Sequence, residues 1–355
     1  MIRVVERHTA TQPIRFADEA AIQQAATVIQ SGGLVAFPTE TVYGLGADAT
    51  NSSAVAKVFE VKGRPLFDPL IVHVASQHEA CSLWIHCPPM AQKLMESFWP
   101  GPLTLVLPKR GCVPDLVTAG FSTVALRMPD HPMALELIRQ AGCPIAAPSA
   151  NRFGRPSPTT ARAVREELGS RMGCVLDGGP APLGIESTVI GFDGSRAVLL
   201  RPGGLPAEAI ERLLRCRLLR PRRSKVAGSP GRLERHYAPA TPLYLLRENG
   251  SPIRPIGRSI AWQKVGLLAW KPTPLQERCA QTELLSRRGD LREAAVRFFE
   301  ALRRLDAAGL EAVVALLPPP NGLGLAIRDR LQRGASGQVV GGFGPADGEV
   351  VVRSW

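Results

Sequence analysis

The first two hundred residues alternate between helical periodicity and short apolar runs. Residues 17–33 space their apolar side chains three and four positions apart, on one face of a helix that should end at Gly32: Ile22, Ala25, Ala26 and Ile29. Further helical patterns occur near 51–61, 88–98, 131–141 and 159–168. Seven apolar runs are typical of buried strands: 34–37, 70–74, 103–107, 124–128, 144–147, 189–192 and 197–200. This alternation predicts an α/β domain.

The pattern changes after residue 214. Residues 212–225, "RLLRCRLLRPRRSK", carry seven basic side chains and no acidic one, and "SPGRLERHYAPATP" after them has no usable periodicity. So long a connection is usually functional or disordered. Beyond it, "PLYLL", "VGLLAW" and "AVVALL" indicate strands, and residues 289–309 form an amphipathic helical pattern. We therefore predict a first domain at 1–214, a linker at 215–241 and a smaller α/β domain at 242–355.

Length and composition are those of an ordinary two-domain soluble protein. The chain has 355 residues, of which 45% are hydrophobic and 21% charged. No segment approaches the run of about 18 apolar residues that crosses a bilayer, so no membrane partner is expected. The first sixteen residues have scattered charges and no apolar signal region. These features predict a cytoplasmic protein.

Charge and cysteine content narrow the function classes further. The net charge of +12 favours polyanionic partners, either nucleotide phosphates or RNA. Seven cysteines, an odd number without a CxxC pair, argue against both a disulfide framework and a structural zinc site. We expect reduced thiols that are mostly buried.

Two short tripeptides suggest a phosphate-binding site. Walker A, GxGxxG, HExxH and GxSxG patterns are all absent from the sequence. Lys62 and Arg64 flank a glycine, and an extended segment would place both cations on one side. Ser149 and Asn151 follow an apolar strand, at the strand end where α/β folds usually bind ligands. Either tripeptide alone is more often a solvated turn than a binding site.

Other polar positions interrupt the apolar pattern. In "PTETVYGLG", Thr41 lies where the strand at 34–37 should turn, with glycines behind it that free the backbone. His73 lies inside the strand "LIVHV", and Arg127 ends the strand "VALR". The insertion "EST" at 186–188 follows a glycine-rich stretch. Singly, these are typical of a core histidine, a surface charge and a hairpin.

Taken together, the motifs resemble a known family. "PTETVYGLG", "KGRP", "PLIVHV", "ALRMPDHP", "APSANRFGRPSPTT", "DGGPAPLGIESTVI" and "LLRPGG" occur in the order of the YrdC-like domain. With "SPGRLERHYAPATP" and "GLGLAIRDRLQR", the whole chain resembles the two-domain form of the threonylcarbamoyl-AMP synthases. The resemblance implies a twisted mixed sheet with flanking helices, followed by a smaller Rossmann-like α/β domain.

The resemblance also implies a reaction and its ligands. L-threonine, bicarbonate and ATP would give threonylcarbamoyl-adenylate and pyrophosphate, with Mg²⁺ carried by the ATP. A partner transferase would then use the product to modify the adenosine beside the anticodon of certain tRNAs. Positions matching ATP contacts, with the first two also catalytic, are Lys62, Arg64, Thr123, Ser149, Asn151, Ser157, Arg201 and Tyr237. Positions matching the threonine pocket are Thr41, His73, Arg127, Ala147 and Ser187.

One position departs from the family pattern. The family commonly has Asn after "RPLF", whereas this chain has Asp68. Asp68 would place a carboxylate near the presumed phosphates, where it either helps to hold Mg²⁺ or turns away.

The resemblance also implies that the linker folds over the cleft, with Tyr237 near the nucleotide.

Two alternatives compete with this interpretation. A double-stranded RNA or tRNA-binding module would also be basic, but RNA recognition favours exposed aromatic side chains, and aromatics make up only 5% of the chain. A YrdC-like domain of hydrogenase maturation would carry CxxC zinc modules, which this chain lacks. The synthase reading is therefore preferred.

Overall fold

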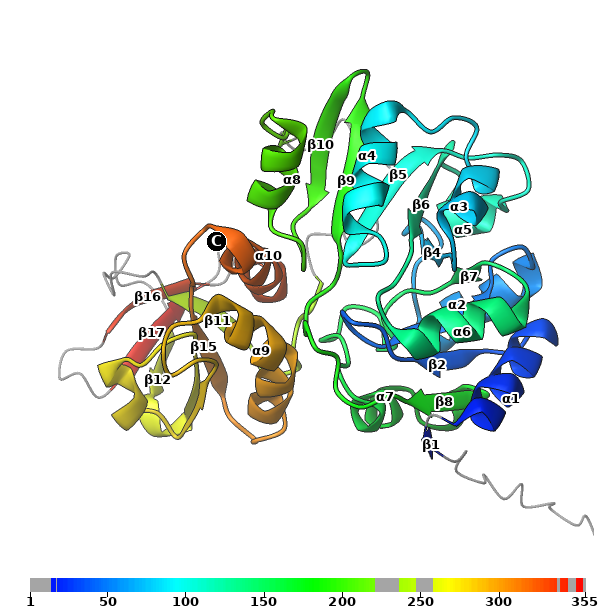
Figure 1. Ribbon diagram of the computed structural model, residues 1–355. Coiled ribbons are helices and arrows are strands. Elements are labelled where there is room, and N and C mark those ends of the chain that lie inside the picture. Colours follow the sequence, from blue (N-terminus) through cyan, green and yellow to red (C-terminus); the bar gives the residue numbers. More distant parts are fainter. Residues whose placement is uncertain are drawn as a thin grey trace, which may run out of the picture.

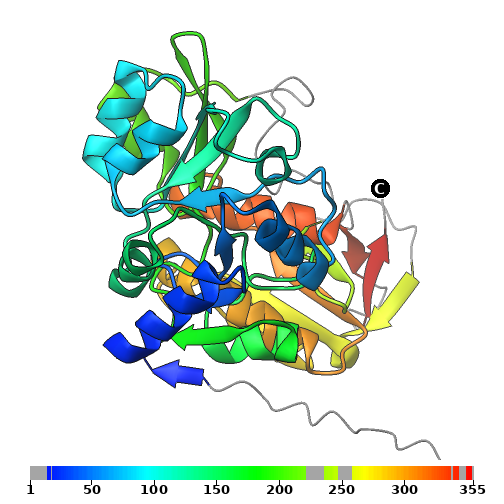
Figure 2. The ribbon, with the colours of Figure 1, turned by 90° about the vertical axis from the view of Figure 1, so that its right-hand side faces the viewer.

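The computed structural model contains two α/β domains that lie side by side (Figure 1). It describes residues 14–16, 18–220, 236–246, 258–336, 339–343 and 349–353. In the view of Figure 2 the first domain lies in front of the second. The predicted α/β class of both domains is confirmed, whereas the exact domain boundaries remain a prediction.

The first domain is built on a mixed ten-stranded sheet with the order β1-β8-β2-β3-β7-β4-β6-β5-β9-β10. Its strands are β1 (Ile14–Phe16), β2 (Val35–Phe37), β3 (Gly44–Asp48), β4 (Ile71–His73), β5 (Leu103–Pro108), β6 (Thr123–Arg127), β7 (Ile145–Ala146), β8 (Cys174–Asp177), β9 (Thr188–Asp193) and β10 (Arg196–Arg201). All seven predicted strands are present. The sequence pattern missed β1, β3 and β8.

Strand β3 corrects the interpretation of the glycines in "PTETVYGLG". Gly44 and Gly46 belong to a strand paired with β2, not to a tight turn. A Cβ on Gly46 would lie 2.7 Å from both Ile145 and the Phe37 ring. The glycines are therefore needed because the strand packs closely against its neighbours.

Eight helices flank this sheet: α1 (Glu19–Gln30), α2 (Ser52–Lys62), α3 (Gln77–Leu83), α4 (Pro89–Phe98), α5 (Asp115–Thr118), α6 (Pro132–Ala141), α7 (Ala161–Leu168) and α8 (Ala207–Leu214), with a 3₁₀ turn η1 (Gly169–Arg171). The predicted apolar face of α1 is confirmed, and the Asp18 carboxylate caps the helix by accepting from the Ala21 amide. Asn51 and Thr160 cap α2 and α7 in the same way. The helices α3, α5 and α8 were not predicted.

The second domain has a seven-stranded sheet with the order β12-β17-β16-β11-β15-β13-β14. Its elements are β11 (Leu243–Leu246), β12 (Arg258–Ala261), η2 (Trp262–Lys264), β13 (Val265–Ala269), η3 (Pro274–Glu277), β14 (Gln281–Leu284), α9 (Leu291–Asp306), β15 (Ala312–Leu316), α10 (Gly322–Ala335), β16 (Val339–Phe343) and β17 (Glu349–Arg353). Strands β16, β11, β15, β13 and β14 are parallel. A parallel core with an antiparallel edge agrees with the predicted Rossmann-like class.

The two domains share apolar surface. Val42 and Ile185 of the first domain are buried in the same hydrophobic cluster as α9 and α10. Gly184 adopts a left-handed conformation (φ +67°), and a Cβ there would lie 2.6 Å from the Ala295 carbonyl. The loop before β9 therefore lies directly on α9, and substitution of Gly184 would push the domains apart.

Charged pairs also join the domains. Arg155 bonds to Asp306 at 2.5 Å, and Arg303 bonds to Glu167 at 2.9 Å. Asp306 and Glu167 are both largely shielded from solvent, which strengthens these pairs relative to exposed ones. The domains therefore dock through specific contacts as well as apolar burial.

Two remaining predictions concern the membrane and the cysteines. None of the helices in the described residues is long and apolar enough to cross a membrane. None of the seven cysteines, all of which lie within the described residues, forms a disulfide. The expectation that most are buried is wrong: only Cys174 is buried, whereas Cys81, Cys112 and Cys216 are exposed. Residues 221–235, which hold most of the linker, lie outside the described residues.

Candidate active site

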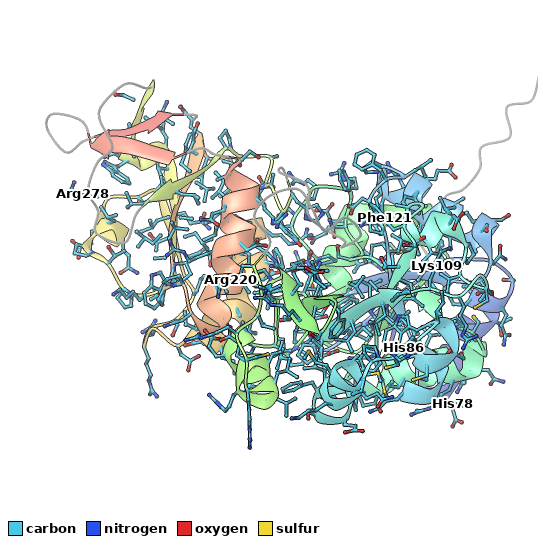
Figure 3. All side chains as sticks on the ribbon, turned by 90° about the horizontal axis from the view of Figure 1, so that it is seen from above. His78, His86, Lys109, Phe121, Arg220 and Arg278 are labelled. Carbon is cyan, nitrogen blue, oxygen red and sulfur yellow. The ribbon has the colours of Figure 1, made fainter. Side chains whose placement is uncertain are left out.

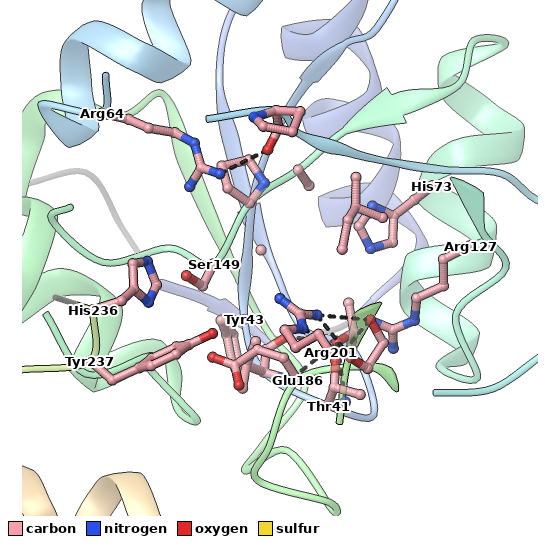
Figure 4. Close-up of a pocket in the computed structure, with 18 residues that line it drawn as sticks. Thr41, Tyr43, Arg64, His73, Arg127, Ser149, Glu186, Arg201, His236 and Tyr237 are labelled. Atoms are coloured by element: carbon pink, nitrogen blue, oxygen red, sulfur yellow. Dashed lines mark hydrogen bonds between the residues drawn. The ribbon is translucent and has the colours of Figure 1, made fainter. Parts of the chain in front are cut away.

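A pocket lies where the first domain meets the second. Its walls come from the segment between β2 and β3, the ends of β4, β6 and β10, the segment after β7, the segment before β9 and the linker. Figure 4 shows Arg64, Ser149, His236 and Tyr237 on one side, and Thr41, His73 and Arg127 on the other. Arg201 and Glu186 lie between these groups. The pocket thus has two chemically distinct ends.

At one end, Arg127 is held by the polar segment after β2. Its Nη1 donates to the Thr41 hydroxyl at 2.9 Å, and its Nη2 lies 2.6 Å from a Glu40 carboxylate oxygen. All three side chains are buried. A buried, fixed guanidinium is suited to bind a small carboxylate with two parallel hydrogen bonds.

His73 completes this end as a neutral side chain. It is buried with its ring at right angles to Phe37, at a centroid distance of 6.0 Å. Burial, and then the positive charge of Arg127, lower the pKa of His73 to about 3. His73 therefore offers a neutral imidazole to the pocket at physiological pH.

This lowered pKa predicts a pH-dependent stability. Unfolded His73 takes up a proton below pH 6.5 and folded His73 does not, so stability falls as the pH drops from about 6.5 toward 3. Between pH 7 and pH 5, wild type should lose about 2 kcal/mol more unfolding free energy than His73→Gln in urea titrations.

The control for this prediction is His86→Gln, at an exposed position (Figure 3). It should lose stability with pH as wild type does. His131 and His236 also have lowered pKa values, but both remain in every variant and cancel in the comparison. Equal losses in wild type and His73→Gln would contradict a neutral, buried His73.

At the other end, Lys62 is a buried cation surrounded by carbonyl groups. It is the last residue of α2, and its ammonium donates to the carbonyls of Ser149, at 2.5 Å, and of Asn151. Burial, and then the charge of Arg64, hold its pKa well below the ordinary value. Within the described residues no carboxylate forms an ion pair with Lys62, so a bound anion would supply the partner that favours its charged form.

Arg64 differs from the expectation in two respects. Gly63 ends α2 in a left-handed conformation, so "KGR" is a helix terminus and not an extended segment. The sequence analysis gave Arg64 no ion-pair partner, yet its guanidinium pairs with Asp68, four residues along the chain, at 2.9 Å. The Asp68 carboxylate thus contacts Arg64, and whether it also contacts Mg²⁺ is left open.

Ser149 and Asn151 lie close to Lys62, as predicted. Ser149 follows β7, lines the pocket and forms a bridge with Gly44 of β3. The Asn151 amide donates to the carbonyls of Arg152 and Arg155, which holds the following loop in place. Through their carbonyls, both residues position the Lys62 ammonium.

Polar contacts also order the middle of the pocket. Arg201 donates to the Ser187 carbonyl at 2.9 Å and to its hydroxyl at 3.2 Å, and that hydroxyl lies 2.7 Å from Thr104. Ser157 donates to a Glu186 carboxylate oxygen at 2.5 Å. These contacts fix two hydroxyl groups and a guanidinium toward the same space.

The end of the linker closes the pocket from the side of the second domain. His236 and Tyr237 are both buried and in edge-to-face contact, with ring centroids 4.0 Å apart. His236 also contacts Phe153 of the first domain, and Tyr237 contacts Phe299 of α9. Tyr237 has a positive φ of 64°, which is uncommon for a side chain of its size. The surrounding contacts therefore hold it in a strained position over the pocket.

Comparisons with known proteins agree with this geometry. A family model described as "Telomere recombination" matches residues 27–203, and one described as "Threonylcarbamoyl-AMP synthase, C-terminal domain" matches residues 205–336. The threonylcarbamoyl-AMP synthase of Bacillus subtilis is 43% identical to this chain, over 91% of this chain and 95% of the relative. The chain belongs to the two-domain threonylcarbamoyl-AMP synthase family.

Other members of the family confirm both domains. The threonylcarbamoyl-AMP synthase of Pyrococcus abyssi is 42% identical over 91% of this chain and 96% of the relative. A crystal structure of the P. abyssi protein complexed with L-threonine superposes with a TM-score of 0.82 at 38% identity, covering 91% of this chain and 97% of that chain. The enzyme interpretation is therefore preferred over an RNA-binding module.

The structure brings most of the synthase-like positions together. Nine of them line the pocket: Thr41, Arg64, His73, Arg127, Ala147, Ser149, Ser187, Arg201 and Tyr237. Three further positions bond directly to lining residues: Lys62, Asp68 and Ser157. Asn151 bonds to Lys62. Thr123 is the exception, because it starts β6 and does not line the pocket. Since β6 runs parallel to β4, Thr123 lies beside the start of β4, near Pro69 and its partner Arg64.

Sequence reasoning also missed several pocket residues of this synthase. Thr39 and Tyr43 line the pocket, and Glu40 pairs with the lining residue Arg127. All three come from "PTETVYGLG", of which only Thr41 was assigned. Glu186 was noted only as part of a polar insertion. Glu40 and Glu186 were missed because an acidic residue is not expected at an anion-binding site unless its arginine partner is known.

Proposed function

We propose that the chain synthesises L-threonylcarbamoyl-adenylate from L-threonine, bicarbonate and ATP, with release of pyrophosphate. The observation that supports this best is the two-ended pocket: Arg127 and Thr41 at one end, and Arg64 with the nearby Lys62 at the other. One end suits an amino-acid carboxylate and the other a triphosphate. With threonine bound at one end and ATP at the other, the threonine amine would lie near the α-phosphate of ATP.

Threonine would bind at the end formed by Thr41, His73, Arg127, Ala147 and Ser187. Arg127 would take the carboxylate, sharing it with the Thr41 hydroxyl that already accepts from its guanidinium. The neutral imidazole of His73 adds no charge that would repel the substrate amine. These roles follow the resemblance and the geometry together.

ATP would bind at the opposite end. Lys62, Arg64 and Arg201 supply positive charge, and Ser149, Asn151, Ser157 and Tyr237 supply neutral polar groups. Thr123 stays among the proposed ATP contacts, because the start of β6 lies beside the start of β4, where the Pro69 carbonyl accepts from Arg64. Asp68 would act by holding Arg64 in place.

Mg²⁺ would arrive with the ATP. Within the described residues no group of three His, Cys, Asp or Glu side chains could hold a metal ion. A metal bound chiefly by phosphate oxygens and water, as is common for Mg²⁺, does not need such a group of side chains. The ion would neutralise phosphate charge when bound, and the side chains of Lys62 and Arg64 would position the phosphates.

The reaction then requires positioning and exclusion of water more than covalent help from the protein. The threonine amine attacks bicarbonate, water leaves, and a carbamate oxygen attacks the α-phosphorus of ATP. The bond from that phosphorus to the bridging oxygen breaks, and pyrophosphate departs. Lys62 and Arg64 would stabilise the charge that develops on the phosphates.

We further propose that a tRNA-modifying threonylcarbamoyl transferase accepts the product. The mixed anhydride is labile in water, so direct transfer to a partner suits its chemistry. The net charge of +12 is compatible with RNA contact during that transfer. The cytoplasmic setting also remains a prediction.

The linker would act as a lid over this chemistry. His236 and Tyr237 are buried against both domains, so their displacement would open the pocket to solvent. Truncation after residue 215 would be a poor test of the lid, since Val42 and Ile185 would lose their apolar cover. A substitution within the lid is cleaner.

Tyr237→Ala should lower the yield of intact threonylcarbamoyl-adenylate per pyrophosphate by about half or more, because water enters around the missing ring. Chromatography of both products measures this ratio. Tyr237→Phe is the matched control: it keeps the ring, so it should keep the yield. A full yield from Tyr237→Ala, with folding verified by circular dichroism, would leave the lid without support.

The reaction itself is tested by incubating the protein with ATP, bicarbonate and single amino acids. Pyrophosphate release should depend on threonine and on bicarbonate, and omission of either should abolish it. Release that is independent of threonine would overturn the proposed function.

A further inference from the structure

Three carboxylates surround the pocket, and each is paired with an arginine: Glu40 with Arg127 at 2.6 Å, Asp68 with Arg64 at 2.9 Å, and Glu186 with Arg330 at 3.0 Å. The first two arginines belong to the first domain. Arg330 belongs to α10 of the second domain, which lies at the junction between the domains (Figures 1 and 3). The first domain therefore leaves one pocket carboxylate to be neutralised from outside.

Arg330 is fully buried and bound in a fixed orientation. Its Nε donates to Glu186, and its Nη1 donates to the Pro202 carbonyl at 2.6 Å. The guanidinium carbon lies 5.2 Å from the centroid of the Tyr237 ring. One side chain thus contacts two walls of the pocket, Glu186 and Tyr237, without lining the pocket itself.

The carboxylate that Arg330 holds remains ionised. Burial alone would raise the pKa of Glu186, but the charge of Arg330, followed by that of Arg201 and the hydrogen bond from Ser157, lowers it below the ordinary value. The pocket therefore contains a permanent negative charge beside Ser157 and Arg201, two of the proposed ATP contacts.

We propose that Arg330 is a positioning residue of the nucleotide site, which neutralises Glu186 and orients it so that an anionic triphosphate can bind beside it. The inference rests on the proposed function, because it takes the ligand at this end of the pocket to be ATP. Without Arg330, Glu186 would repel the phosphates and would also compete for Arg201.

The charge-based role makes a prediction that a packing role does not. Arg330→Gln should weaken ATP binding about tenfold or more, whereas the KM for threonine should change less than about threefold. Adding Glu186→Gln removes the uncompensated charge, so the double variant should regain an ATP affinity within about threefold of wild type. Replacement of a purely structural arginine would not be rescued in this way.

The matched control is Arg328→Gln. Arg328 lies on the same helix, but its guanidinium donates to the Pro318 carbonyl of its own domain at 2.6 Å. This variant should bind ATP as wild type does. Arg330→Lys, which retains a positive charge, should lose less affinity than Arg330→Gln.

ATP binding is measured by calorimetry on the full-length chain with MgATP and without threonine, and pyrophosphate release is measured separately. Absence of ATP binding by wild type would sink the proposed function, whereas equal binding by wild type and Arg330→Gln would sink only the role of Arg330. If Arg330→Gln does not fold, the ATP affinity of the double variant tests the role of Arg330 by itself. A loss of ATP affinity of about tenfold or more in the folded double variant would overturn the inference.

Discussion

Lys62→Met is expected to lower kcat/KM for pyrophosphate release about a hundredfold, equivalent to about 3 kcal/mol of transition-state stabilisation. The physical reason is that its ammonium is buried, forms no ion pair within the described part of the chain and touches only two carbonyl groups. Such a cation contributes little to folding but much to binding a triphosphate. The unfolding free energy should change by only about 1 kcal/mol, because loss of two hydrogen bonds is offset by removal of a buried amine.

The matched control for this prediction lies on the same helix. Lys57 also donates to a carbonyl, that of Gly32 at 2.7 Å, but outside the pocket. Lys57→Met should retain wild-type turnover. Steady-state kinetics together with urea denaturation distinguish the two effects: unchanged turnover in Lys62→Met would remove this residue from the site. Arg64→Ala is less informative, because it would also break the buried ion pair with Asp68 and so change stability together with turnover.

Arg127→Lys should raise the KM for threonine about thirtyfold, since lysine keeps the charge but loses the two-pronged contact with a carboxylate, a difference of about 2 kcal/mol. The KM for ATP should change less than about twofold. Glu40 and the Thr41 hydroxyl remain near the new ammonium, so the charge balance at this end is retained. Saturation kinetics in each substrate measure the two constants.

Arg139→Lys is the control for Arg127→Lys. Arg139 lies on α6 in an exposed pair with Glu136, where a change of cation should affect neither substrate. If instead ATP affinity collapses in Arg127→Lys while threonine affinity is retained, Arg127 has been assigned to the wrong ligand.

Much of the fold could be predicted from local patterns. The apolar face of α1 and the strands around Leu70 and Leu103 depend on periodicity, which sequence alone reveals. Strand β3 could not be recognised, because two glycines and a polar start resemble a turn, and only the packing of Phe37 and Ile145 requires them. The helix α10 was quoted as a motif but not recognised as an element, since Gly322 and Gly324 weaken a helical pattern.

The site was partly predictable for a different reason. Short motifs identified Lys62, Arg64, Ser149 and Arg127 because each stands at the end of a regular element. Ion-pair partners were harder, because Glu186 and Arg330 are separated by 144 positions. Only the docking of the two domains brings such a pair together.

That docking has a consequence for the order in which the protein is made. Synthesis proceeds from the N-terminus, so the strands of the first domain leave the ribosome before Arg330 does. A nascent or prematurely terminated chain would carry Lys62, Arg64 and Arg127 but would hold an unneutralised Glu186. Such a chain is therefore expected to bind ATP more weakly until α10 docks against the first domain.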